Sequence, residues 1–281
     1  MRWQGRAGSG NVEDRRGMGM ALPVGGGIGG IVLLLLISAL TGTNPADIIN
    51  SAPTPSESTG TSGSGNLEDD PQAQFVSVVL KDTEDVWDQV FRERGAEYRK
   101  PVLVLFTNAT QSGCGVGQSA MGPFYCPNDQ KVYLDLSFFR DLDTRFGAPG
   151  DFAQAYVVAH EIGHHVQTLT GISDRVHSAQ ERASERQANA LSVRMELQAD
   201  CYAGIWGHFA ARRDLLDPGD AEEGLRAAAA IGDDRLQRQA QGRIVPESFT
   251  HGSSEQRMSW LRRGLDNGRL EACDTFADGT F

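Results

Sequence analysis

The 281-residue sequence predicts an α+β protein in which a small sheet packs on a mainly helical body, preceded by a single transmembrane helix and a flexible tether. Three observations lead to this prediction. A long uncharged apolar stretch precedes a polar linker, two short β-forming runs follow it, and nearly everything after Phe152 has helical periodicity. We therefore divide the chain into residues 1–17, 18–41, 42–74 and 75–281.

The first two segments predict a membrane anchor. Residues 18–41 are uncharged, strongly apolar in their second half and long enough to cross a bilayer. Arginines outnumber acids before this stretch, which predicts that residues 1–17 stay in the cytoplasm and that the rest of the chain lies outside it. A cleaved signal peptide is the competing interpretation, but no small-x-small cleavage site follows the apolar run.

Amino-acid composition and net charge limit the possible partners and the size of the core. The net charge of −11 argues against nucleic acid as a partner, because phosphate binding needs a basic face. Apolar residues make up 40% of the chain, enough for a proper core. Residues 42–74 are rich in Ser, Thr, Gly and Pro, so we expect a flexible tether that lifts the folded domain from the membrane.

The folded part is expected to open near Phe75. Apolar residues at helical spacing predict a helix over Asp82–Tyr98, capped by Asp82 or Thr83. Two runs read as strands, Val102–Phe106 and Lys131–Leu136, and a short helix is expected over Phe138–Phe146. From there the predicted helices cover residues 152–170, about 175–213, 219–231, 233–240 and 254–266.

The four cysteines fit an oxidising compartment and allow three pairings. Cys114 and Cys126 bracket a short Gly-rich loop, so we pair them, which leaves Cys201 with Cys273. The second bond would tie the C-terminus to a core helix. No Cys-x-x-Cys is present, so the spacing does not suggest a cysteine metal site.

The stretch from Val157 to Val166 contains His160-Glu161-x-x-His164 in an apolar run without proline. On a helix, the two histidines project from one face, one turn apart, and can share a zinc ion. Glu161 then serves as the base that takes a proton from zinc-bound water. His165 lies about 100° round the helix from His164, so we expect it to be structural or to support a ligand. The alternative is a histidine-rich helix face without a metal.

A catalytic zinc site needs three protein ligands and an open position. Glu196 is the expected third ligand, because it lies on a later helix that can return antiparallel to the motif. Asp200, one turn further, can accept a hydrogen bond from the free N–H of a ligating histidine. Ala199, Ala203 and Gly204 would let the two helices pack closely. Glu181 and Glu185 are competing candidates for the third ligand, but they lie in a charged run that looks exposed. The alternative is that Glu196 and Asp200 form a solvated acidic edge of the helix and bind no metal.

Several further stretches strengthen this interpretation. The pairing of the zinc motif with Glu196-x-x-x-Asp200 looks like the gluzincin arrangement. The whole chain from roughly Phe75 onward resembles the bacterial membrane-anchored family of neutral zinc metallopeptidases. The resemblance rests on segments 122–127, 196–201, 231–237, 246–254 and 273–276. It implies a zincin-like fold, Zn²⁺ as cofactor and a membrane anchor.

The resemblance also points to a donor for the developing oxyanion, because gluzincins take a histidine or tyrosine from a downstream region. His251 is the expected catalytic residue, Tyr202 is the alternative, and a capping or core-polar role for His251 stays open. We expect Asp233 and Asp234 to cap a helix. Arg235 could hold a substrate carboxylate or pair with an acid. His177 and His208 are expected to be surface or satisfied core residues.

The sequence therefore predicts a membrane-anchored zinc peptidase that faces the extracytoplasmic side and cleaves peptides or proteins. Val102–Phe106 or Lys131–Leu136 would offer a strand edge to an extended peptide. Two alternatives remain open: a zinc hydrolase of a non-peptide amide or ester in the cell envelope, and a membrane-tethered binding protein with structural zinc. The sequence does not determine the substrate, endo- or exopeptidase action, latency or the oligomeric state.

Overall fold

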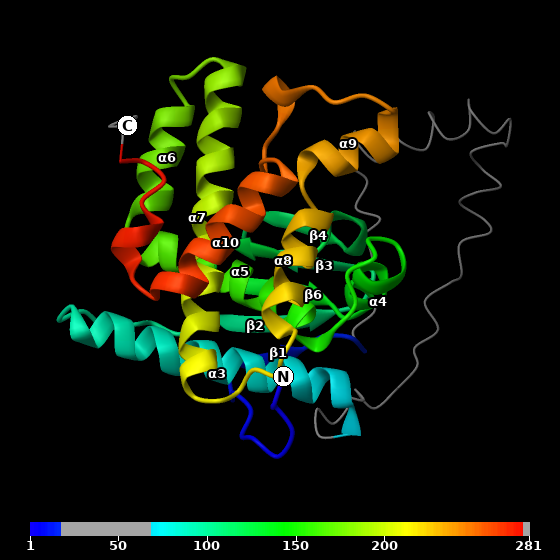
Figure 1. Ribbon diagram of the computed structural model, residues 1–281, viewed down its shortest axis with the longest axis vertical. Coiled ribbons are helices and arrows are strands. Elements are labelled where there is room, and N and C mark those ends of the chain that lie inside the picture. Colours follow the sequence, from blue (N-terminus) through cyan, green and yellow to red (C-terminus); the bar gives the residue numbers. More distant parts are fainter. Residues whose placement is uncertain (18–68, 278–281) are drawn as a thin grey trace, which may run out of the picture.

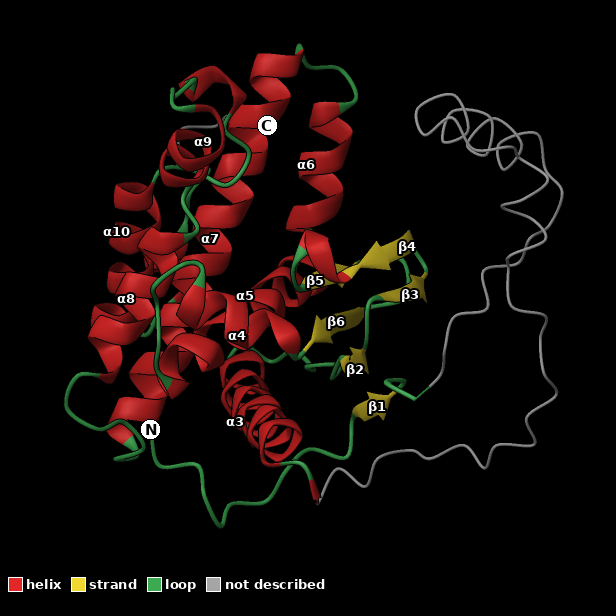
Figure 2. Cartoon of the chain, turned by 90° about the vertical axis from the view of Figure 1, so that its right-hand side faces the viewer, coloured by secondary structure: helices red, strands yellow, loops and turns green. Residues whose placement is uncertain are grey.

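The computed structural model describes residues 1–17 and 69–277. The predicted anchor and most of the tether lie outside these residues. An α+β arrangement is confirmed: Figure 2 shows the helices gathered on one side of a small sheet. Helix α5 (Asp151–Leu169) packs between that sheet and the remaining helices, so the zinc motif lies at the junction of the two layers. No helix in the described part of the chain is both long and apolar enough to span a membrane.

The main sheet has the order β1-β2-β6-β5. Its strands are β1 (Val12–Asp14), β2 (Val102–Phe106), β5 (Phe124–Cys126) and β6 (Lys131–Asp135), with β1, β2 and β6 parallel and β5 antiparallel. The two predicted strands are confirmed. They form the centre of the sheet, so the prediction that either presents a free edge is wrong. The edge strand beside α5 is β5.

Successive side chains of a strand point to opposite faces of the sheet, and apolar residues on both faces bury it on both sides. Leu103 and Leu105 of β2 join the large core beneath the helices, whereas Val104 and Phe106 join a smaller cluster on the opposite face. A separate hairpin of β3 (Ala109–Ser112) and β4 (Gly115–Gln118) leads through the short helix η2 (Ser119–Met121) to β5. This hairpin was not predicted, because its strands are short and largely polar.

Helix α3 (Pro71–Glu93) begins before the predicted position. Asp70 caps it by accepting the backbone N–H groups of Gln72 and Ala73, and Pro71 occupies the first turn, where its missing N–H costs nothing. The predicted cap at Asp82 or Thr83 is wrong. Asp82 is fully buried in the helix interior instead.

Residues 1–16 belong to the folded domain rather than to a separate segment. The backbone N–H of Leu103 donates to the carbonyl of Asn11, 2.9 Å away, and β1 extends the sheet at β2. Arg6 forms a 2.6 Å ion pair with buried Asp82 in α3. The hydroxyl of Ser9 donates to the carboxylate of Glu84, also in α3, at 2.7 Å. Asp82 also pairs with Arg213, 2.9 Å away, so removing this segment would take one of two arginine partners from a fully buried carboxylate and the Ser9 donor from Glu84.

The helical body otherwise follows the prediction with small boundary shifts, except at one break. The predicted helix over 175–213 is two helices, because the chain turns at residues 181–184 and Ser184 starts a new helix with a capping box to Gln187. The helices are α4 (Ser137–Thr144), α6 (Ile172–Gln180), α7 (Glu185–Arg212), α8 (Asp220–Ala230), α9 (Asp233–Gln241) and α10 (Ser254–Asn267). Two short helices, η3 (Pro246–Ser248) and η4 (Leu270–Cys273), complete this body.

Small residues bring three helices into close contact around α7. A side-chain carbon on Gly163 of α5 would lie 2.9 Å from the backbone oxygen of Ala199, so α5 and α7 approach closely, as the sequence predicted. Gly204 faces α10 instead of α5. A Cβ there would lie 2.8 Å from the Cα of Gly264, so this glycine fixes the α7–α10 contact.

Both predicted disulfides are present, Cys114–Cys126 and Cys201–Cys273. The first joins the turn of the β3–β4 hairpin to the end of β5. The second joins the middle of α7 to η4 near the C-terminus. The described residues contain no free cysteine.

Candidate metal centre

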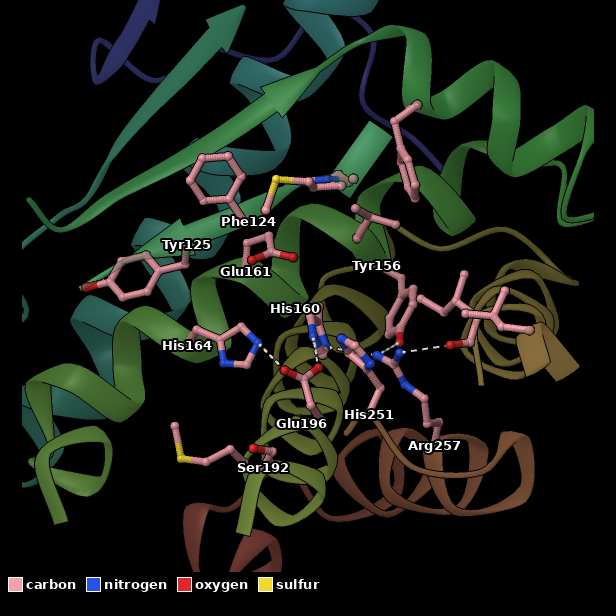
Figure 3. Close-up of a pocket in the computed structure, with 18 of the residues that line it drawn as sticks. Phe124, Tyr125, Tyr156, His160, Glu161, His164, Ser192, Glu196, His251 and Arg257 are labelled. Atoms are coloured by element: carbon pink, nitrogen blue, oxygen red, sulfur yellow. Dashed lines mark hydrogen bonds and ion pairs between the residues drawn. The ribbon is translucent and has the colours of Figure 1, made fainter. Parts of the chain in front are cut away.

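Helix α5 supplies the motif residues. It has apolar residues on nearly every side and is buried along most of its length, so its polar residues must find partners inside the protein. His160 and His164 lie one turn apart with ring centroids 4.8 Å from each other. Figure 3 shows both rings turned toward the same point in a cleft, opposite a carboxylate from α7.

That carboxylate is Glu196. One of its oxygens lies 3.1 Å from Nε2 of His160, and the other lies 3.4 Å from Nε2 of His164. One ligand atom from each of the three residues falls within 4.8 Å of the others. Two imidazole nitrogens and one carboxylate oxygen are the donor set that catalytic zinc takes, so these residues fit a zinc ion with a position left open. The structure places the three predicted ligands together.

Hydrogen bonds on the far side of each ring fix the tautomers. The N–H at Nδ1 of His160 donates to Asp200, 2.8 Å away, as the sequence predicted. The N–H at Nδ1 of His164 donates to the side-chain oxygen of Gln167 at 2.9 Å, and Gln167 in turn donates to the backbone carbonyl of Met195. In the neutral form of each ring, Nε2 therefore has a lone pair directed at the cleft, as metal ligation requires.

Electrostatics favour a cation at this point. Burial alone would lower the pKa of His160, but the carboxylates of Asp200 and Glu196 raise it to about 10. Burial alone would likewise raise the pKa of Glu196, but the two adjacent histidines hold it well below its usual range. The site therefore attracts positive charge, which is a proton when no metal is bound and a metal ion otherwise.

Glu161 lies beside the ligands without being one of them. It is buried, and its carboxylate makes no hydrogen bond or ion pair with any described residue. Burial raises its pKa, chiefly because the charged form is desolvated. In Figure 3 the carboxylate points into the cleft between His160 and Phe124 of β5. A carboxylate held in this way can exchange a proton with a molecule bound in the cleft.

The cleft has a volume of about 720 Å³. Edge strand β5 forms one wall with Phe124 and Tyr125, α5 forms the floor, and α7 lies opposite. Aromatic and aliphatic residues in or just after α4, just after α8 and in α9 also line the cleft, namely Phe138, Phe146, Ile231 and Leu236. Met121 lies at the rim and is 69% exposed. The cleft is therefore apolar on several sides of a polar centre, as is common for substrate pockets.

His251 borders the cleft next to Glu196 in Figure 3, as expected of a residue that takes part in chemistry. Its Nδ1 lies 3.2 Å from a carboxylate oxygen of Asp233, and this hydrogen bond is the main reason that its pKa is raised. The other oxygen of Asp233 accepts the backbone N–H groups of Thr250, His251 and Gly252. Asp233 therefore holds the His251 loop, and the prediction that it caps a helix is wrong.

Tyr202 does not reach the cleft. It lies on the side of α7 that faces α3, is 3% exposed, and packs edge-on against Trp87 with ring centroids 5.6 Å apart. The alternative prediction that Tyr202 stabilises the oxyanion is therefore wrong. The competing acids Glu181 and Glu185 are exposed and also lie away from the ligand group.

The remaining histidines and Arg235 have local roles. The N–H at Nδ1 of His208 donates to the backbone carbonyl of Leu265, 2.8 Å away, and the His177 side chain is 77% exposed. Both observations agree with the prediction. Arg235 contacts the backbone carbonyl of Phe146 and is exposed.

Three residues of the site were missed by sequence reasoning. Tyr156 and Arg257 both bond to Asp200, and Gln167 bonds to His164. Tyr156 precedes His160 by one helical turn, and Gln167 follows His164 by three residues, so helical spacing could have suggested both. Arg257 comes from α10, and no local pattern distinguishes it from the exposed arginines nearby.

A second group of carboxylates, Asp151, Asp220 and Glu223, also has spacing compatible with a metal. The amine of Met1 lies 2.6 Å from Asp151 and 3.3 Å from Asp220. Two of the three acids are therefore already paired with a cation of the chain itself, and Glu223 accepts the backbone N–H of Phe152, so we assign no metal to the group.

Comparisons with known proteins agree with this geometry. The family model described as "Putative neutral zinc metallopeptidase" matches residues 1–276. The chain is 51% identical over 287 aligned residues to "Uncharacterized protein YpfJ" of Escherichia coli (strain K12), covering 98% of this chain and 99% of the relative. It is 41% identical over 215 aligned residues to "Uncharacterized protein Rv2575" of Mycobacterium tuberculosis (strain ATCC 25618 / H37Rv), covering 73% and 72%. No solved structure matches the chain significantly.

His165 gives a pH-dependent prediction. It is fully buried, its N–H at Nε2 donates to the carbonyl of Arg99 at 2.6 Å, and Nδ1 accepts the hydroxyl of Tyr125 at 3.0 Å. Burial lowers its pKa to about 4, below the usual value near 6.5 of an unfolded chain. In acid the unfolded chain therefore binds a proton that the folded chain does not, so stability falls as the pH drops from about 6.5 to about 4.

We predict that the titration of this histidine lowers the free energy of unfolding by about 2 kcal/mol when the pH falls from 7 to 5. Urea unfolding at both pH values, for wild type beside His165→Gln, measures the effect. Glutamine can keep both hydrogen bonds but does not titrate, so the variant should lose less stability in acid by this amount. Equal losses in the two proteins would contradict the prediction.

Proposed function

The chain belongs to the family of neutral zinc metallopeptidases, and we propose that it is a zinc-dependent peptidase that hydrolyses peptide bonds in an open cleft. The observation that carries the proposal is the convergence of His160, His164 and Glu196 beside a buried carboxylate, Glu161, that is not a ligand. A purely structural zinc site is normally closed by four protein ligands and has no need of a base.

His160, His164 and Glu196 would hold the zinc ion. When bound, zinc acts as a Lewis acid toward water and toward the carbonyl of the scissile bond. Asp200 and Gln167 keep the two rings oriented through their Nδ1 atoms, so ligation needs no side-chain rearrangement. Preorganisation of this kind lowers the cost of binding the metal.

Glu161 is the proposed general base and acid. Its carboxylate accepts a proton from the attacking water and then passes that proton to the nitrogen of the leaving amine. The pKa raised by burial suits both steps, because a base is most effective when its pKa lies close to the working pH. Its side chain is free of competing partners among the described residues.

His251 is the proposed donor to the developing oxyanion. Asp233 accepts a hydrogen bond from the N–H at Nδ1 and raises the pKa of His251, which favours the imidazolium form. In that form the N–H at Nε2 can donate into the cleft. The half-exposed position of this ring, 51% by side chain, allows it to meet a bound substrate. The backbone bonds that Asp233 accepts hold the loop against movement during that contact.

An extended peptide is the proposed substrate. Edge strand β5 pairs with β6 on one side only, so its other edge can add a substrate strand by backbone hydrogen bonds. Strand β5 takes the place of the two central strands that the sequence suggested as the peptide-binding edge. The apolar residues that line the cleft suit a large apolar side chain next to the scissile bond.

We predict that Glu161→Gln lowers kcat/KM for a cleaved peptide by at least about 100-fold while zinc content stays at the wild-type level. The measurement is cleavage of a mixture of unstructured peptides, followed by mass spectrometry, with metal analysis of the same samples. Glu181→Gln, an exposed acid outside the cleft, is the matched control and should keep full activity.

Full peptidase activity in Glu161→Gln would contradict the proposed base. If wild type and Glu161→Gln cleave no peptide but differ in hydrolysis of envelope amides or esters, the protein is a hydrolase of another class. If they differ in nothing, the zinc is structural and the protein is a binding protein.

Membrane attachment through residues 18–41 remains part of the proposal, but the predicted orientation needs revision. A single crossing would put β1 and β2 on opposite sides of the bilayer, and their backbone pairing opposes this. We propose that residues 1–17 and 69–277 share one compartment. Two disulfides favour an oxidising, extracytoplasmic one.

We predict that Gly10→Cys and Arg262→Cys, each introduced alone into the full chain, react equally with a membrane-impermeant maleimide in intact spheroplasts. Both positions are exposed, and the native cysteines are bridged, so only the new thiol reacts. If Arg262→Cys is labelled in intact spheroplasts but Gly10→Cys only after lysis, the N-terminus is cytoplasmic and the proposed shared compartment is wrong.

A further inference from the structure

Arg257 is a buried charged residue that the proposed mechanism does not use. It is 2% exposed and enters the space between α5 and α7 from the first turns of α10. Burying a guanidinium is costly unless its N–H groups are bonded and its charge is paired. Its partners therefore indicate why it is present.

The main partner is Asp200. Nε of Arg257 donates to one carboxylate oxygen at 2.8 Å, and Nη2 donates to the other at 2.9 Å, a bidentate pair of the strongest kind. Nη2 also lies 3.1 Å from the hydroxyl of Tyr156, and Nη1 lies 3.4 Å from the backbone carbonyl of Ile231. Because these groups surround it, Arg257 cannot turn to hold a substrate.

Asp200 is saturated by this arrangement. Its Oδ1 accepts from Tyr156 at 2.5 Å, from His160 at 2.8 Å and from Arg257, and its Oδ2 accepts from Arg257. Among the described residues, Arg257 thus supplies two of the four bonds and the only one to Oδ2. Without it, the carboxylate would be free to rotate about its terminal bond and to leave the line of the His160 N–H.

We propose that Arg257 is a positioning residue for the metal: it fixes the carboxylate of Asp200, and through Asp200 the ring of His160. The proposal rests on the proposed zinc site. It makes α10 part of the metal centre although α10 contributes no ligand. Because Gly204 and Gly264 set how closely α10 approaches α7, the same contact places the guanidinium at bonding distance from Asp200.

The test is a double-mutant cycle read out as zinc affinity. Zinc dissociation constants of the full chain are measured by competition with a chromophoric chelator for wild type, Arg257→Gln, Asp200→Asn and the double variant. We expect Arg257→Gln to weaken zinc binding about 10- to 100-fold, the range for partners that orient a metal ligand. In the Asp200→Asn background the same substitution should have little further effect.

Two further variants serve as controls. Arg213→Gln removes another arginine paired with a buried carboxylate, Asp82, and should leave zinc affinity unchanged. Arg257→Lys keeps the charge but not the bidentate geometry. If Arg257→Gln does not fold, a weakened affinity in the lysine variant supports the proposal, and unchanged affinity in that variant overturns it.

Equal zinc affinity in Arg257→Gln and wild type would overturn the inference, as would an equal loss with and without the Asp200 carboxylate. Either result would leave Arg257 as a fold-stabilising residue only. Failure of wild type to bind zinc is a different outcome, because it refutes the proposed function itself.

Discussion

The buried carboxylate of Asp200 is the constraint on which the site depends. An ionised carboxylate without contact to water must be matched by donors. Here the donors come from two helices, Tyr156 and His160 from α5 and Arg257 from α10, while Asp200 itself lies on a third, α7. Burial alone would raise the pKa of Asp200, yet Arg257 and His160 hold it below its usual range. One charge therefore joins the helices and orients a candidate metal ligand at the same time.

The surrounding fold keeps those helices in position. Close glycine contacts join α7 to α5 and α10, and the Cys201–Cys273 bridge ties the chain after α10 back to α7. The N-terminal residues act on the other side of the domain, where Arg6 neutralises Asp82 in α3 and β1 covers the edge of β2. Of the two edge strands of the described sheet, β1 and β5, it is β5 that lies beside the ligands. Stability and access to the cleft are therefore provided by different parts of the molecule.

The sequence predicted those site residues that are related to one another by spacing along a helix. His160 and His164 follow from helical spacing, as do Glu196 and Asp200 once a returning helix is assumed, and the structure brings all four together. Contacts between distant parts of the chain left no such signal. Arg257 lies 57 residues from Asp200 in a helix with other arginines. The three-residue strand β1 is too short for periodicity, and it pairs with a strand about 90 residues later. The helix break at residues 181–184 was missed because the charged run there fits a helix as well as a loop.

The proposed zinc site depends on Glu196, which completes the ligand set with two histidines of α5. The most direct measurement is the zinc content and zinc dissociation constant of the purified full chain, wild type beside Glu196→Ala, with Glu181→Ala as a control for an exposed acid. We expect about one zinc per chain in wild type and control, and a large loss of affinity in Glu196→Ala. Equal zinc binding by all three proteins would contradict the claim, because the metal would then be held elsewhere.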